Sequence, residues 1–542
     1  MKTFLILVLI VAVVGLPFLF QGKETTIGRA DDTVVVITPH NEAIRFEFET
    51  AFRRWYEERT GRTVNVDWRV IGGTSDIVRY LNSEFENSFR NLWTGPLGES
   101  WTPAVRSAYN NRRLTVDGEP QDEGEKARQA FLDSDVSVGI DIFFGGGAYD
   151  FGRQAQMGAL VPWMETEQLE ERFPDSILPQ EFAGEEFWDE QGRWIGAVLS
   201  SFGIIYNKDS LNRLGIKKPP AQWGDLTIPL LIGQVALADP TKSGSITKAF
   251  EMIVQDQMHR SVDALEAEGL SADEAEAVAV PEGWMNAMQM IQLISANARY
   301  FTDSATKGPM DVAKGDCAVG MSIDFYGRYE SEIIETRGGG DRLQYITPEG
   351  ASTLSADPIG ILRGAPNREV ADRFVDFVMS EDGQQLWGFR AGVEGGPVEY
   401  SLRRSPAFRT IYEGANRELL SEPDVNPYKT VLDFVYRPDW TGRLFSPLRF
   451  LIRVAFIDPH DELVSAWKGI QRARERGDVA AANEAFAVFS NLETIRFSEA
   501  AGPIAEVLSG GDKIAEVRLA RDLADGFRAQ YRQALAIANG SI

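Results

Sequence analysis

The strongest constraint on the fold is a β-α-β pattern near the start of the chain. Residues 33–37 form an apolar run rich in β-branched side chains, which predicts a buried strand. Apolar residues then recur across 48–55 with the spacing of one helix face, and residues 64–70 alternate as in a strand with one covered face. A strand, a helix and a second strand in this order predict a parallel sheet with helices outside it, so the fold class is α/β.

Four apolar strands of the predicted sheets end in small polar residues or in glycines. They are the segments "ITPHN", "IFFGGG", "LADPTKSGS" and "SIDFYG". In an open parallel sheet, ligands bind just beyond the carboxyl ends of the strands, so four such ends indicate a site better than one does. Together with a hydroxyl pair after the second strand, the candidate ligand contacts are His40, Asn41, Thr74, Ser75, Gly145, Gly146, Thr241, Ser243, Gly244, Ser245, Asp324 and Tyr326.

The segment "ADPTKSGSITKAF" has two interpretations. Pro240 ends a strand, and either Ser243 or Ser245 can cap the helix that follows. In the first interpretation the segment is a helix cap and nothing more. In the second, the free N–H groups of the helix start and the nearby hydroxyl groups bind an anionic or hydroxyl-rich group, and Gly244 lets that group approach the backbone. Taken alone, the segment fits both.

The other strand ends also keep two interpretations. The glycines 145–147 form a turn, or they leave bare backbone amides beside a ligand. His40 is either a structural histidine or a ligand contact. Asp324 and Tyr326 belong to packing at a strand end that is followed by an aspartate turn, or they face a cleft as an acceptor and a phenol. Cys317 fits a small buried side chain of the core.

Composition excludes several classes of function. The net charge of −25 argues against a nucleic-acid partner, although a local site can differ in sign from the whole. A single cysteine excludes an intramolecular disulfide and a cysteine metal cluster, and the widely spaced His40, His259 and His460 argue against a zinc site. The sequence holds no nucleophile elbow, P-loop or dinucleotide fingerprint. We therefore expect neither an enzyme nor a bound cofactor.

The chain begins with one lysine and an uninterrupted apolar run from Phe4 to Phe20. A secretory apolar region spans about 7–15 residues and a membrane-spanning helix about 17–25, so this run lies between the two. Gly28-Arg29-Ala30 fits a small-residue cleavage site but lies late. We expect an uncleaved membrane anchor, with a cleaved signal peptide as the alternative. In both cases residues from about 31 onward are exported to a bacterial envelope compartment.

Four segments together are similar to the bacterial extracellular solute-binding proteins of ABC transporters. They are "FGIIYNKDSLNRLGIKKPPAQWGDL", "GQVALADPTKSGS", "DVAKGDCAVGMSIDFYG" and "GILRGAPNREVADRFVDFVMSEDGQQLW". The resemblance extends over residues 33–415 and points to the branch that takes up ferric iron or sugar phosphates. It implies a type II periplasmic-binding fold, in which two α/β lobes joined by crossing hinge strands close on a ligand and then dock on a membrane permease.

The resemblance also implies how the chain is divided. Ser200 and Ser201 would lie on a crossing strand beside the cleft, and the return crossing would lie near residues 347–357. The expected units are an anchor or signal at 1–30, the first part of lobe 1 at 31–199 with an insertion at about 84–135, lobe 2 at 200–346, the return part of lobe 1 at 347–424, and a helical C-terminal extension at 425–542.

The resemblance leaves the solute open. Its ferric-binding members use a histidine, matched by His40, and adjacent tyrosines, of which only Tyr326 is present. With Asp324 these residues make a poor donor set for Fe(III), which needs several anionic oxygen ligands. The "TKSGS" helix start and a loop with Ser304, Thr306 and Lys307 fit a phosphorylated or carboxylated solute better. An organic anion or sugar phosphate is therefore favoured, ahead of iron and of a polyamine.

The expected partners follow from this interpretation. A small solute and an ABC permease of the inner membrane are expected, the N-terminal segment is expected to tether the protein, and the protein is expected to be a monomer. Two other classes of function stay open. A tethered binding domain could serve a sensory system without transport, and a hydrolase is the least favoured alternative because loose carboxylates do not define a catalytic geometry.

Overall fold

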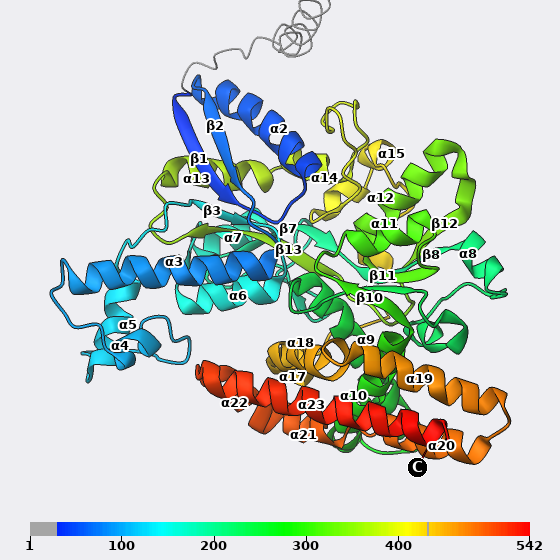
Figure 1. Cartoon of the computed structure of the whole chain (residues 1–542). Coiled ribbons are helices and arrows are strands. Elements are labelled where there is room, and N and C mark those ends of the chain that lie inside the picture. The colour runs from blue at the N-terminus through cyan, green and yellow to red at the C-terminus, as the bar shows by residue number, and fades with distance from the viewer. Residues whose placement is uncertain (1–29, 431–432, 542) are drawn as a thin grey trace, which may run out of the picture.

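A computed structural model describes residues 30–430 and 433–541, which form two large β-sheets with helices on both faces of each and one two-stranded sheet (Figure 1). The expected anchor or signal segment falls outside these residues. Within the described part of the chain, no helix combines the length and the apolar character needed to cross a bilayer.

Lobe 1 is built on a seven-stranded sheet with the order β14-β7-β13-β3-β1-β2, and β4 pairs with β13. The strands are β1 (Asp32–Ile37), β2 (Val64–Arg69), β3 (Ile142–Phe144), β4 (Leu160–Val161), β7 (Ile195–Ser200), β13 (Ser355–Leu362) and β14 (Ser405–Pro406). Strand β1 runs parallel to both β2 and β3, as the β-α-β pattern predicted. The first connecting helix, α2 (Glu42–Thr60), begins where the Asn41 side chain accepts a hydrogen bond from the Ile44 N–H.

Alternation along the central strands divides the lobe 1 core in two. Phe144 faces a cluster with α2, α13 (Arg368–Val378) and α14 (Glu381–Gly388), and Phe143 faces a cluster on the other side with α3 (Thr74–Thr94) and α6 (Ala148–Met157). The second cluster extends into the expected insertion, where helices α4 (Pro103–Ala108) and α5 (Glu123–Asp133) add buried aromatic and apolar side chains.

Lobe 2 is built on a five-stranded sheet with the order β10-β9-β11-β8-β12. Its strands are β8 (Phe202–Asn207), β9 (Val235–Ala238), β10 (Ala298–Thr302), β11 (Val319–Ile323) and β12 (Leu343–Ile346). Helices α9 (Gly244–Ala267) and α10 (Ala272–Asn297) cover one face, and α11 (Lys307–Lys314) with the buried Cys317 lies on the other. The sequence suggested a turn after β11, but helix α12 (Asp324–Ile334) begins there at once, and it packs on β12 so closely that Gly327 lies against Tyr345.

The two lobes are joined by crossing strands, which confirms the predicted two-lobed fold. Strand β7 ends in the first sheet at Ser200 and β8 begins in the second at Phe202, so Ser201 alone separates them. The chain returns between β12 and β13. The Ser352 hydroxyl accepts a hydrogen bond from the Phe202 N–H at 3.1 Å and donates one to the Phe202 carbonyl at 2.8 Å, so the two crossings are tied together.

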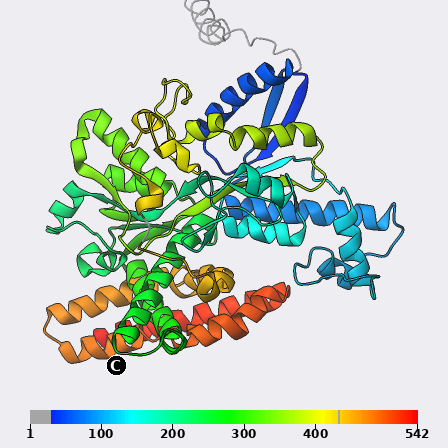
Figure 2. The same cartoon turned by 180° about the vertical axis from the view of Figure 1, so that it is seen from behind.

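The C-terminal extension, defined here as residues 433–541, is helical as predicted and shares one hydrophobic core with lobe 2. Its main helices are α18 (Phe445–Ile452), α19 (His460–Glu475), α20 (Val479–Phe489) and α23 (Lys513–Ala538). They lie beneath lobe 2, at the end of the molecule opposite to β1 and α2 (Figure 2). Buried Gln292 of α10 donates to the Phe489 carbonyl at 2.8 Å, so polar as well as apolar contacts hold the extension.

Glu47 on α2 offers a test of how the return segment of lobe 1 is held. Its buried carboxylate accepts hydrogen bonds of 2.6–2.7 Å from the backbone N–H groups of Val398, Glu399 and Tyr400. We expect Glu47→Ala to lower the free energy of unfolding by about 2–4 kcal/mol, because it leaves three N–H groups without their acceptor. Glu58→Ala, on the exposed face of the same helix, should change it by less than about 0.5 kcal/mol. Urea denaturation of both variants measures this, and equal losses would contradict the assignment.

Candidate functional site

The two lobes touch where glycine segments face each other. The Gly73 backbone lies so close to lobe 2 that a Cβ atom there would be 2.8 Å from the Lys242 carbonyl oxygen. A Cβ atom on Gly244 would likewise be 2.7 Å from Oδ2 of Asp150, and Gly147 lies beside the Gly244 backbone. A larger side chain at Gly73 would hold the lobes apart, and one at Gly244 would displace the Asp150 carboxylate. The "GGG" and "TKSGS" segments predicted for a common site therefore meet across the lobe interface.

Predicted residues of lobe 1 form a continuous wall beside this contact. Gly145 lies directly against the His40 ring, and a Cβ atom on Gly146 would be 2.6 Å from the Thr74 side chain. Both glycines have positive φ angles, 89° and 128°, which other residues rarely adopt. Ser75, next to Thr74 at the start of α3, is buried and its hydroxyl has no hydrogen-bond partner within the described residues.

On lobe 2, the start of α9 is a helix cap that also faces the other lobe, so it fits both interpretations of its sequence. The Ser243 hydroxyl caps the helix by accepting from the Ile246 N–H at 3.3 Å, and Thr241 is held by the Asp239 carboxylate. The first turn faces Asp150 of lobe 1, whose Oδ2 is buried without a hydrogen-bond partner in the described structure. Burial raises the pKa of the Asp150 carboxyl, against the opposing effect of nearby arginines.

Arg404 joins the candidate residues on the hinge side of the interface. Its buried guanidinium pairs with Asp357 and donates to the Ser200 hydroxyl at 2.7 Å. It also lies 3.4 Å from Nε2 of His40 and 4.1 Å from the centre of the Phe325 ring, which belongs to the other lobe. A single side chain thus connects the ends of β1, β7 and β13 with the start of α12.

His40 is neutral in this setting. Burial lowers its pKa well below the usual range, and the positive charges of Arg404 and Arg45 lower it further. Because arginine can only donate hydrogen bonds, Nε2 of His40 is the acceptor and the ring proton lies on Nδ1. That Nδ1 is buried and has no partner in the described part of the chain.

The residues considered for iron do not assemble into a metal site. Asp324 pairs with Arg328 at 3.3 Å, and burial raises the pKa of the Tyr326 phenol to about 12, which disfavours a phenolate ligand. The Arg404 guanidinium stands beside both His40 and Phe325, so a bound cation would meet positive charge. Over residues 30–430 and 433–541, no group of three or more His, Cys, Asp or Glu side chains could hold a metal ion.

Three other predicted ligand contacts are Asn41, Ser201 and Ser245, and each has different surroundings. Asn41 is exposed and caps α2, so its side-chain oxygen is already used. Ser201 lies at the crossing, 3.4 Å from the Thr347 hydroxyl, and its carbonyl accepts from the Asp324 N–H. Ser245 is half-buried in the first turn of α9.

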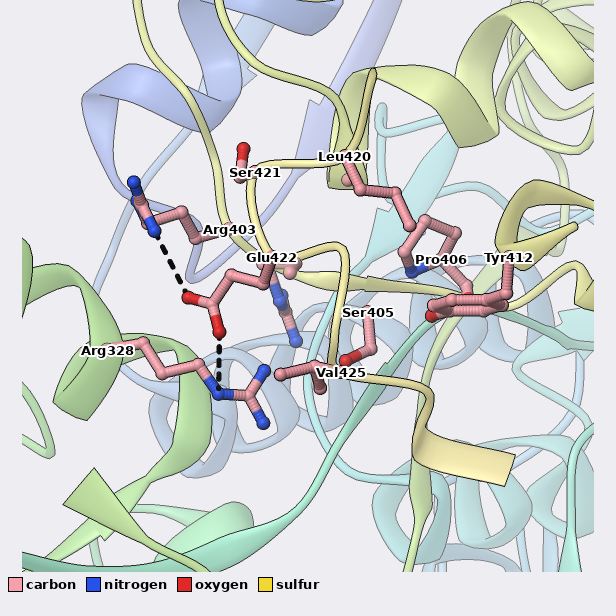
Figure 3. A pocket seen from close by; sticks show the side chains of 11 residues that line it. Arg328, Arg403, Ser405, Pro406, Tyr412, Leu420, Ser421, Glu422 and Val425 are labelled. Carbon is pink, nitrogen blue, oxygen red and sulfur yellow. Dashed lines mark hydrogen bonds and ion pairs between the residues drawn. The ribbon is translucent and has the colours of Figure 1, made fainter. Parts of the chain in front are cut away.

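Ion pairs close the interface on a further side, as Figure 3 shows. Arg328 of lobe 2 lies 3.6 Å from Glu422, and Arg403 pairs with the same carboxylate at 3.2 Å and with Glu332 of lobe 2. The pocket beside these residues has a volume of about 20 Å³, which is room for about one water molecule. A solute of metabolite size could not enter it unless the lobes separated.

Three residues of the site were missed by sequence reasoning. Asp150 follows the glycine run by three residues and could have been included as the first charged side chain of the next helix. Asp357 lies inside the predicted return crossing. No sequence pattern around Arg404 indicated a site. Helices α13 and α14 separate it from β13 in the chain, and only the tertiary fold brings it to the site.

Comparison with known proteins places residues 107–407 in the family of bacterial extracellular solute-binding proteins. An uncharacterized protein of Haemophilus influenzae is 24% identical over 249 residues, which cover 45% of this chain and 60% of the relative. A putrescine/cadaverine-binding protein of Pseudomonas aeruginosa is 25% identical over 176 residues, 32% of this chain and 44% of the relative. The chain therefore matches less than two thirds of the length of either relative.

Among solved structures, the periplasmic binding protein AfuA from Actinobacillus pleuropneumoniae, with fructose-6-phosphate bound, aligns with a TM-score of 0.46 and 19% identity over 79% of this chain and 99% of that one. The apo ferric ion-binding protein A of Pasteurella haemolytica aligns with a TM-score of 0.47 and 12% identity over 78% and 96% of the two chains.

The buried His40 predicts a pH dependence of stability. Its pKa is depressed in the folded state, so between the unfolded value near 6.5 and the folded value only the unfolded chain binds the proton. The free energy of unfolding should therefore fall as the pH drops below about 6.5, by up to about 1.4 kcal/mol per pH unit from this group. His40→Gln should remove this component, whereas His259→Gln, at a half-buried histidine with a smaller pKa shift, should remove less. Urea denaturation across this range measures it, and an unchanged slope in His40→Gln would refute it.

Proposed function

The chain belongs to the family of bacterial extracellular solute-binding proteins, and from this premise we propose that it is an envelope receptor that binds a sugar phosphate or a similar hydroxylated organic anion between its lobes and delivers it to an ABC permease. The N-terminal segment would tether it to the inner membrane. Binding, without chemical conversion of the solute, is its role in this proposal.

One observation carries the choice of solute. Three buried polar atoms on the lobe 1 side of the interface have no hydrogen-bond partner in the described structure, namely Ser75 Oγ, Asp150 Oδ2 and Nδ1 of His40. Buried polar atoms are nearly always paired in folded proteins, and an unmet one costs about 1–3 kcal/mol. The hydroxyl groups of such a solute can donate a hydrogen bond to Oδ2 of Asp150 and accept one from the N–H at Nδ1 of His40. These unpaired atoms therefore support a ligand with several hydroxyl groups, such as a sugar.

The charges at the interface favour an anion over a cation. The N–H groups of the α9 start and the nearby Arg404 are positive, and Asp357 and Asp324 are already paired with arginines. A ferric ion would face Arg404, and a polyamine would find Asp150 as a lone carboxylate beside arginines. Iron and a polyamine are therefore included in the thermal-shift experiment described next.

A thermal-shift experiment on the purified protein tests the proposal. We expect glucose 6-phosphate or fructose 6-phosphate to raise the melting temperature more than the parent sugars do, because binding to the folded state at 100 times Kd adds about 2.7 kcal/mol of stability. Ferric citrate and putrescine should have no effect. A shift with either of these and none with phosphorylated sugars would contradict the proposal.

A matched pair of variants sharpens the test. Asp150→Asn keeps the shape of the buried side chain but replaces one acceptor oxygen with a donor, so the shift with the phosphorylated sugar should decrease. Asp273→Asn, at an exposed aspartate near the start of α10, should leave the shift unchanged.

A further inference from the structure

The C-terminal extension reaches across the interface and contacts lobe 1. The Phe445 ring of α18 stacks on Tyr149 of α6, with ring centres 4.1 Å apart and planes inclined by 29°. The next residue, Ser446, places its hydroxyl 3.1 Å from the Tyr149 hydroxyl. Because α18 packs against α9 of lobe 2, these contacts form only when the lobes are closed.

Two guanidinium groups from opposite sides converge on the Ser446 hydroxyl. Nη1 of Arg153, on α6, is 3.5 Å from Oγ, and Nη2 of Arg449, on α18, is 3.4 Å from it. Both distances exceed the usual range of about 2.7–3.2 Å, and a hydroxyl has about two lone pairs to share among these groups and Tyr149. The single hydroxyl therefore does not satisfy the two cations.

A third arginine belongs to the same cluster. Arg112, from the segment between α4 and α5, lies 3.4 Å from Oε1 of Gln156, on the turn of α6 that follows Arg153. Arg112 is exposed at the surface, and partial desolvation together with the neighbouring positive charge of Arg153 lowers the pKa of its guanidinium. We call Arg112, Arg153 and Arg449 the arginine cluster.

Several described arginines of this chain, Arg90 and Arg113 among them, have no carboxylate partner. The arginine cluster differs from them because its three guanidinium groups also lie near one another. In residues 30–430 and 433–541, none of its three members forms an ion pair with a carboxylate, although the sequence has 80 acidic and 55 basic residues apart from histidine. Asp150 faces Arg153 and Arg449, but it lies beyond ion-pair distance and is one carboxylate against three guanidinium groups. Like charges held together in this way favour binding of an anion.

We propose that the arginine cluster and the Ser446 hydroxyl form a binding site for a phosphate or carboxylate group at the edge of the lobe interface. Guanidinium groups bind these oxyanions through paired N–H donors, and Ser446 donates one more hydrogen bond. The inference rests on the proposed function in one respect: the oxyanion is the charged end of the solute whose hydroxylated body lies along the lobe 1 wall.

This site would give the extension a part in lobe closure. Arg112 and Arg153 belong to lobe 1, and Arg449 moves with lobe 2. Closing brings like charges together, so an oxyanion between them binds the closed form more tightly than the open form and shifts the population toward closure. The extension thereby becomes one wall of the solute site rather than an appendage of lobe 2.

Inorganic phosphate is the probe that tests the site. We expect phosphate to raise the melting temperature of the full chain above its value in sodium chloride of equal ionic strength. In the double variant Arg153→Gln/Arg449→Gln, the apparent Kd for phosphate should rise by roughly tenfold or more, the scale of one lost charged contact. Arg443→Gln, at an exposed arginine just before α18, should behave like the wild type. Acetate in place of phosphate distinguishes a carboxylate site from a phosphate site.

A second measurement separates loss of the site from loss of the fold. Without phosphate and at low salt, Arg449→Gln should be at least as stable as the wild type, because it relieves repulsion within the cluster. Equal effects of phosphate and chloride on the wild type, or a phosphate effect that survives in the double variant, would overturn the proposal.

Failure of this inference can be told apart from failure of the proposed function. If glucose 6-phosphate stabilises the wild type and the double variant equally, solute binding stands and the arginine site is rejected. If phosphate acts through the arginines but no sugar phosphate stabilises the protein more than phosphate does, the site stands and the proposed solute is rejected.

Discussion

The double crossing between the sheets is the constraint on which the rest of the structure depends. Strand β7 passes into β8 with only Ser201 between them, and Ser352 ties this crossing to the return strand. Two short connections that run side by side favour rotation of the lobes about one axis. The chain passes from the lobe 1 core to the lobe 2 core once more between Tyr428 and Phe434. The double crossing also brings the strand ends of both lobes to one interface, so polar residues far apart in the sequence meet there.

Closure of the lobes relies on two kinds of contact with different consequences. Glycines at positions 73 and 244 let the backbones approach, and the ion pairs of Arg328 and Arg403 with Glu422 and Glu332 cross the interface on another side. These contacts are complete within the protein. The Ser75 hydroxyl and Oδ2 of Asp150 have no hydrogen-bond partner in the described structure, and the arginine cluster has no carboxylate partner there. Unpaired polar atoms occur elsewhere in the described structure too, so those at the interface support the site only together with the strand ends that meet there.

Much of the fold could be predicted from the sequence because it is encoded locally. The apolar run 33–37 and the strand-to-helix transition at Ser243 act over a few residues, and each is found as expected. The helix that begins at Asp324 was missed, because "DFYG" resembles a turn and only packing on Tyr345 shows otherwise. Arg404 and the arginine cluster could not be foreseen. They come from segments whose partners are set by the tertiary fold, and no local pattern distinguishes them from other arginines.

The distance between the lobes in solution tests the central claim most directly. Spin labels can be attached at exposed positions 58 in lobe 1 and 217 in lobe 2, with the buried Cys317 replaced by alanine, and the distance measured by pulsed electron spin resonance. We expect glucose 6-phosphate to shift the distribution toward the distance found in this structure, and glucose to do so less. An identical distribution with and without every phosphorylated sugar would contradict binding between the lobes.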